Sequence, residues 1–170
     1  METTHLIQGL ARNADAIAAL AAAIPAAGVS WRPAPTAWST LEVINHLADE
    51  EAEDFRTRLD FLLHRPGERP PAIDPVGWVS ARAYNQRSFD ESLARFQAER
   101  RRSLDWLAGL TAPDWQRALQ RPDGAWLRAG DLLVAWVAHD LLHLRQLVEL
   151  QYHFRTTQAA PFDVAYAGDW

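Results

Sequence analysis

The chain has 170 residues, of which 48% are apolar and 23% are charged, and its formal net charge is -5. These values are typical of one globular domain, residues 1–170, and they exclude a disordered or fibrous protein. The negative charge provides no general attraction to nucleic acid or to an anionic membrane, so we expect neither as a partner.

The amino-acid usage also restricts the possible chemistry. Cysteine is absent, and all 17 basic residues are arginines. Disulfides, thiolate ligands, a cysteine nucleophile, a lysine Schiff base and a lysine-bearing phosphate loop are therefore excluded, whereas imidazole, carboxylate and guanidinium chemistry remain. No apolar run is long enough to span a membrane, and the N-terminus has no signal-peptide pattern, so we expect a cytoplasmic protein.

The first half of the chain predicts two helices. Apolar residues at spacings of three and four indicate a helix over residues 3–23. A second helix, over residues 39–62, is expected to begin with a capping box formed by Ser39 and Glu42. Trp38 precedes this box and is placed to pack against the first turns of the helix.

The second half predicts two more helices. Ser88 and Glu91 form another capping box, which indicates a helix over residues 88–109. Arg100 interrupts the apolar stripe of this helix; we expect its guanidinium to reach solvent, with an anion contact in a pocket as the alternative. The most apolar stretch, residues 132–151, predicts a central helix that begins at residue 130 or 131.

The connections between the predicted helices are unusually long. Residues 64–77 contain four prolines and are expected to exclude helix, and no segment shows the alternating pattern of a strand pair. The predicted fold is therefore all-α, a four-helix bundle with long crossover loops. We expect the tryptophans of these loops to pack over the bundle ends and to wall a pocket: Trp31, Trp78, Trp115 and Trp126.

Three histidines are candidates for a shared site. His139 and His143 are four residues apart, so their side chains lie on one helix face, which also carries Trp136 and Leu147 and is expected to point inward. An unpaired buried polar group costs about 1–3 kcal/mol, so both imidazoles need partners. His46 lies near the buried edge of the second helix. The three rings either meet at one metal ion or form separate hydrogen bonds.

Neighbouring polar residues offer several roles. Asp49 and Glu50 lie one turn after His46, Asp140 adjoins His139, and Gln146 lies one turn after His143. A carboxylate at such a position orients a ligand imidazole, acts as a general base or faces water, and Gln146 bonds either to a ligand or to a neighbouring helix. The other histidines are expected to be solvated: His5, His64 and His153.

The chain resembles the DinB/YfiT-like superfamily in three segments: residues 38–50, residues 84–102 and residues 139–146. The resemblance implies the four-helix bundle and makes His46, His139 and His143 the ligands of a divalent metal ion, with zinc or nickel expected. It assigns no catalytic residue. Relatives include maleylpyruvate isomerase and S-transferases that use bacillithiol, mycothiol or glutathione, as well as damage-inducible proteins without known activity. Many members are homodimers, which we expect here too.

A tris-imidazole site leaves coordination positions open for a small molecule. The leading prediction is a metal-dependent transferase that activates a low-molecular-weight thiol as cosubstrate and attacks a small-molecule substrate. There are three alternatives: a metal-dependent hydrolase, a non-catalytic, stress-induced protein that binds metal or a small ligand, and a bundle whose histidines are purely structural.

Overall fold

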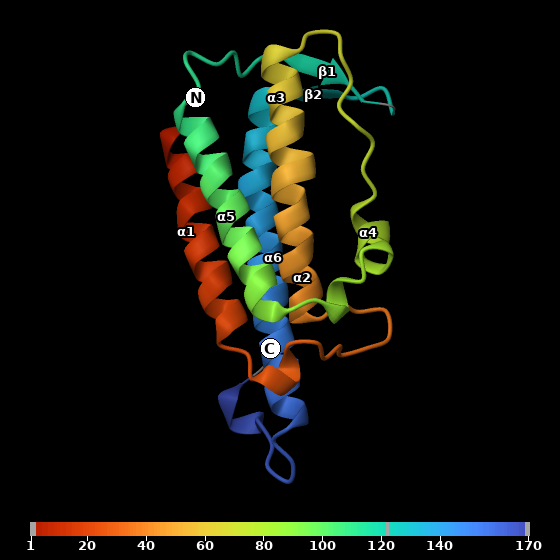
Figure 1. Ribbon diagram of the computed structural model, residues 1–170. Coiled ribbons are helices and arrows are strands. Elements are labelled where there is room, and N and C mark those ends of the chain that lie inside the picture. Colours follow the sequence, from red (N-terminus) through yellow and green to blue (C-terminus); the bar gives the residue numbers. More distant parts are fainter. Residues whose placement is uncertain (1–2, 122, 169–170) are drawn as a thin grey trace.

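The computed structural model describes residues 3–121 and 123–168 and contains four long helical rods side by side (Figure 1). They are α1 (Thr4–Ala22), a continuous rod formed by α2 (Thr40–Asp49) and α3 (Arg56–His64), then α5 (Phe89–Ala108) and α6 (Ala129–Thr157). The helices α1 and α6 run in one direction, and the α2–α3 rod and α5 run in the other. The predicted four-helix bundle is confirmed.

The helix boundaries follow from capping. Ser39 and Glu42 form the reciprocal capping box expected at the start of α2. At the start of α5 the hydroxyl of Ser88 accepts a hydrogen bond from the backbone of Glu91. The weakly marked start of α6 is capped by Asp131, whose carboxylate accepts from the backbone of Arg128. These bonds satisfy backbone N–H groups that have no partner within a helix, which explains why each helix begins where it does.

A π-helical segment, η2 (Glu50–Phe55), joins α2 to α3 without interrupting the rod. The sequence predicted one regular helix here, so this feature was missed. A π-helical turn contains more residues than an α-helical turn and shifts the faces of the residues that follow. Glu51 and Phe55 of this segment are both buried.

The parallel α2–α3 rod and α5 require a long crossover, which runs back along the bundle (Figure 1). It contains α4 (Pro75–Ala81) and the short 3₁₀ helix η3 (Tyr84–Gln86). The expectation that residues 64–77 exclude helix is therefore wrong at its end. Proline is tolerated at the first helical position, and Asp74 caps α4 by accepting a hydrogen bond from the backbone of Gly77.

The connection between α5 and α6 forms a β hairpin, where no strand was expected. Strands β1 (Ala118–Gln120) and β2 (Trp126–Arg128) pair antiparallel, with Leu119 opposite Leu127. Three-residue strands are too short to show a recognisable alternation in the sequence. Gly124 turns the chain at a positive φ of 86°, a conformation that glycine adopts without strain.

The loop tryptophans do not behave alike. Trp31 packs edge-on against Phe154 with ring centroids 5.5 Å apart, and Trp115 packs against the core from the other end of the bundle. Trp78 lies under the guanidinium of Arg82, whereas Trp126 is 67% exposed. The expected packing over the bundle ends therefore holds for two of the four.

The core is divided into two apolar clusters with a polar layer between them. One cluster includes Leu10, Phe55, Leu107 and Trp136, and the other includes Ile17, Leu47, Phe96 and Leu147. Between the members of the two clusters each rod contributes one residue to a polar network, which consists of the half-buried Asn13 and the buried Glu51, Arg100 and Asp140. No helix among the described residues is long and apolar enough to cross a membrane.

Arg100 lies at the centre of this polar layer and is only 1% exposed. Its guanidinium donates to Asp140 of α6 at 2.7 and 2.8 Å, to Glu51 of η2 at 2.6 Å and to the backbone carbonyl of Leu10 in α1 at 2.7 Å. The expectation that this group reaches solvent is wrong. Two carboxylates and a carbonyl from three other segments compensate for the loss of hydration.

Removing this guanidinium should destabilise the bundle strongly. Arg100→Met leaves Asp140 and Glu51 buried without a cation, and we expect the free energy of unfolding to fall by about 3–5 kcal/mol. Urea unfolding measures the change. Arg101→Met, at the exposed next position of α5, is the matched control and should change the value by less than about 0.5 kcal/mol. Equal stability of the two variants would contradict the role assigned to Arg100.

Candidate metal centre

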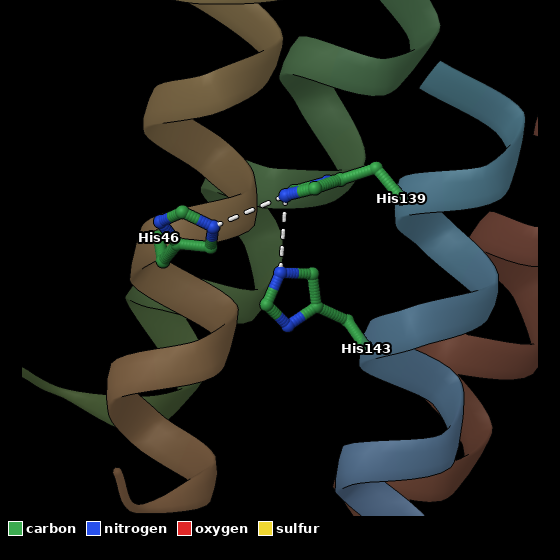
Figure 2. Close-up of side chains that lie close together, drawn as sticks. All are labelled: His46, His139 and His143. Atoms are coloured by element: carbon green, nitrogen blue, oxygen red, sulfur yellow. Dashed lines mark hydrogen bonds between the residues drawn. The ribbon is translucent and has the colours of Figure 1, made fainter. Parts of the chain in front are cut away.

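The helices α2 and α6 bring three imidazoles together at the level of the polar layer. His46 projects from α2, and His139 and His143 project from successive turns of α6 toward it (Figure 2). The Nε2 atom of His139 lies 3.4 Å from Nε2 of His46 and 3.1 Å from Nε2 of His143. One ligand atom from each ring lies within 4.8 Å of the other two. The convergence expected from the resemblance is therefore present.

These distances suit a shared cation. Three imidazole nitrogens that bind one tetrahedral ion at about 2.0–2.1 Å lie roughly 3.3 Å apart. In addition, Nδ1 of His143 lies 2.8 Å from Oε1 of Gln146. An amide oxygen only accepts, so the proton is on Nδ1 and the lone pair on Nε2 points at the other imidazoles. Of the two partners considered for Gln146, a ligand candidate or a neighbouring helix, the structure shows the first, His143.

Burial keeps the three imidazoles neutral. Loss of hydration, followed by repulsion from His143 and His139, lowers the pKa of His46 from 6.5 to about 2. The same burial, together with His143 and Arg100, lowers the pKa of His139 to about 3. Burial also lowers the pKa of His143, although Gln146 and Asp140 oppose the shift. A neutral imidazole is the form that binds a metal ion, so all three rings are ready to act as ligands at neutral pH.

Two of the predicted neighbouring carboxylates serve the scaffold. Asp140 binds Arg100 and the amide of Asn13, and Asp49 binds Tyr84, Arg82 and Arg95. Among the described residues, neither forms a hydrogen bond to an imidazole. Asp140 nevertheless matters to the site, because its bond to Arg100 holds the turn of α6 from which His139 projects.

Glu50 is the exception among these carboxylates. It follows His46 by one helical turn, is 4% exposed, and its Oε1 atom has no hydrogen-bond partner among the described residues. Burial, with a smaller contribution from Asp54, raises the pKa of Glu50 from 4.5 to about 8. A buried carboxyl with a pKa near neutrality is able to take up and release a proton under physiological conditions.

Aromatic rings enclose the imidazoles on two sides. The ring of Trp38 lies 4.9 Å from that of His46 and is parallel to that of His143, while the ring of Phe55 lies 5.1 Å from that of His139. Trp38 and His143 also line a cavity of about 500 Å³, together with Gln146, Glu149, Leu150 and His153. Sequence reasoning assigned Trp38 only to packing, although its place just before the helix that carries His46 was a signal for the site.

The pH dependence of stability should report the buried neutral imidazoles. In the metal-free unfolded chain each histidine gains a proton near pH 6.5, whereas the folded chain resists protonation down to much lower pH, so the unfolded state binds more protons below 6.5. The free energy of unfolding should therefore fall with decreasing pH by up to about 1.4 kcal/mol per pH unit for each imidazole.

Urea unfolding of chelator-treated protein between pH 7 and 5 measures this slope. His46→Gln should reduce the slope by about one proton. His153→Gln, which replaces an exposed histidine of α6 outside the cluster, is the control and should show the slope of the unsubstituted protein. An unaltered slope in His46→Gln would mean that this ring is not held neutral.

The comparisons with known proteins agree with the fold. No curated protein shows a significant sequence match. The solved structure of YfiT from Bacillus subtilis, described as a probable metal-dependent hydrolase with an unusual four-helix bundle topology, superimposes with a TM-score of 0.79 at 19% sequence identity, over 90% of this chain and 87% of that one. The sequence pattern of the DinB superfamily matches residues 10–147. The chain therefore belongs to the DinB superfamily.

Proposed function

We propose that this protein is an enzyme that binds one divalent metal ion through His46, His139 and His143 and uses it to activate a small nucleophile. The observation that carries the proposal is the convergence of three neutral Nε2 atoms inside the bundle. Without a cation, one Nε2–H of His139 can serve only one of its two nitrogen contacts fully, so these desolvated imidazoles would be poorly satisfied. Zinc and nickel both suit this donor set.

Such an ion, when bound, would supply Lewis acidity and lower the pKa of a water molecule or thiol that it binds. The residues around it divide the remaining tasks. Glu50 is the described carboxyl best suited to donate a proton, because a pKa of about 8 keeps it mostly protonated at neutral pH and its buried Oε1 atom has no hydrogen-bond partner among the described residues. Trp38 and Leu150 wall the cavity next to His143, and this apolar surface would hold the substrate and exclude water.

Two nucleophiles fit this arrangement. Hydrolysis is favoured by the structural similarity to YfiT and needs nothing beyond water. Transfer to a low-molecular-weight thiol, as in the thiol-dependent relatives, would be consistent with a chain that has no cysteine of its own. We place hydrolysis first and retain thiol transfer as the second candidate.

Metal analysis tests the centre itself. Protein purified after growth with zinc or nickel should contain close to one ion per chain, and His139→Ala should reduce this content by ~tenfold or more, because two imidazoles bind far more weakly than three. His153→Ala is the matched control, since this exposed histidine lies about four turns after His139 along α6 and should leave the content unchanged.

A second substitution tests the orientation of His143. Gln146→Met keeps the imidazole but removes the acceptor of its Nδ1–H, and we expect the metal affinity to fall by roughly 10–100-fold.

For the first of these two experiments, equal metal content in the wild-type protein and in His139→Ala would refute the centre.

Product analysis separates the two nucleophiles. Metal-loaded protein is incubated with p-nitrophenyl acetate, with and without glutathione, and the products are identified by mass spectrometry. A hydrolase should yield acetate at a rate that does not depend on the thiol, whereas a transferase should yield acetyl-glutathione. Either product should form at least tenfold more slowly with His139→Ala. Full metal retention without turnover of this or related esters would favour a non-catalytic binding protein.

The homodimer expected from the resemblance is also a proposal. The outer face of α6 exposes Leu141 and Leu142, each 55% accessible, with the exposed Val134 and Val148 about two turns away on either side. An apolar stripe of this kind is typical of a helix that packs against a second subunit. Sedimentation analysis of the mass in solution measures this directly.

A further inference from the structure

A second cavity lies away from the imidazoles, between the crossover and the β hairpin. It has a volume of about 640 Å³ and is walled by residues 69–73, by the hairpin and by Asp54, Arg58 and Leu132. This volume is within the range of small-molecule sites in proteins. The crossover between α3 and α5 and the connection between α5 and α6 both contribute to it, and the function proposed above uses neither of them. We call it the arginine cavity.

Guanidinium groups dominate the charge of this cavity. Arg58, Arg69 and Arg121 line it together with a single carboxylate, Asp54, in a protein whose net charge is negative. Arg58 is paired with Asp54, and Arg121 lies 3.0 Å from Asp123. Arg69 has no hydrogen-bond or ion-pair partner among the described residues. Arg69 is exposed, so its guanidinium is accessible to an anion from outside the protein.

The floor of the cavity is apolar. It is formed by Leu119 and Leu127, which are paired at the centre of the hairpin, and by Leu132 near the start of α6. Leu132 belongs to the apolar cluster that includes Leu10 and Trp136, and the other two leucines pack against this cluster, so the packed interior fixes all three positions. Ile73, Pro70 and Pro71 face them from the crossover. Fixed apolar walls with one uncompensated positive charge at the rim suit an amphipathic molecule that carries a single negative charge.

The arginine cavity is separate from the metal centre. Leu132 precedes His139 by two turns of α6, a rise of about 10 Å. The stacked rings of Phe55 and Trp136, with centroids 5.3 Å apart, occupy the level of the bundle between them. A ligand in the arginine cavity therefore does not need a metal ion at the imidazoles.

We propose that the arginine cavity is a second binding site, which takes a small organic monocarboxylate whose apolar body lies on the leucine floor and whose carboxylate binds Arg69. A single carboxylate matches the one unpaired guanidinium. The planar guanidinium also offers two parallel N–H donors to such a group, which favours carboxylates over neutral molecules of the same shape.

The test uses the full chain after treatment with a chelator, so that it does not depend on the proposed metal chemistry. The probe is 3-phenylpropionate, with 3-phenylpropionamide as its uncharged counterpart, and binding is measured by calorimetry and by shifts of backbone amide resonances. We expect saturable binding of the carboxylate, with shifted resonances in residues 69–73 and in the hairpin. Loss of one charged hydrogen-bond pair should make the amide bind roughly tenfold more weakly.

Substitutions at matched surface arginines locate the site. Arg69→Gln should weaken binding of the carboxylate roughly five- to tenfold, because an exposed charged contact contributes less than a buried one. Arg101→Gln, at an exposed arginine of α5 outside the cavity, should leave the affinity unchanged. Arg69 lies in a connection and has no partner among the described residues, so its variant should fold normally, which circular dichroism checks.

Three results would overturn the proposal. These are no saturable binding to the chelator-treated protein, equal affinity in Arg69→Gln, or binding that appears only when metal is restored and is lost in His139→Ala. The last result would place the carboxylate at the metal centre. Conversely, binding that persists in metal-free protein supports the arginine cavity even if the proposed enzyme activity is absent.

Discussion

The buried guanidinium of Arg100 is the interaction on which the arrangement of the bundle depends. It binds Asp140 of α6, Glu51 of the π-helical segment and a backbone carbonyl of α1, so one side chain of α5 connects all four rods. Apolar packing alone tolerates small shifts of one helix along another, because contacts between apolar groups have little directional preference. Charged hydrogen bonds have defined lengths and angles, and they hold the rods in one register.

This register positions the candidate metal centre. Asp140 and His139 are neighbours on α6, so the carboxylate that binds Arg100 also determines the height of His139 in the bundle. On the opposite rod the π-helical segment directs Glu51 toward Arg100 and Phe55 toward His139. Trp136 connects the two, because its indole N–H donates to Glu51 at 2.7 Å and its ring stacks on Phe55. The structural ion pair and the imidazoles thus form a single polar layer between two apolar clusters.

The helix α2 shows how buried polar residues become available for chemistry. All ten of its residues are buried, and Glu42, Asn45 and Asp49 are each satisfied by side chains of surrounding segments, chiefly arginines. His46 differs, because among the described residues its Nδ1 atom has no partner and its Nε2 atom meets the Nε2 atom of another imidazole, that of His139. A buried polar group without a partner is costly. The surroundings satisfy the polar neighbours of His46 but not His46 itself, so this imidazole is ready to bind an external ligand.

The sequence alone determined the features that depend on near neighbours in the chain. Capping residues set the helix starts, apolar spacing set the number of long rods, and the four-residue spacing of His139 and His143 placed both on one face. The family resemblance added His46 to this pair. These signals act within about one helical turn, so they can be read from the sequence before the chain is folded.

Only the tertiary structure decided the features that depend on contacts between distant segments. The burial of Arg100 is possible because three other segments supply oxygen atoms that accept its hydrogen bonds, and no local sequence pattern predicts these partners. The helix at Pro75, the short hairpin and the π-helical segment arise where tertiary packing outweighs weak local preferences. Likewise, Asp49 and Asp140 became scaffold groups while the Oε1 atom of Glu50 has no partner among the described residues, because the role of a charged side chain depends on which partners the fold brings within hydrogen-bonding distance.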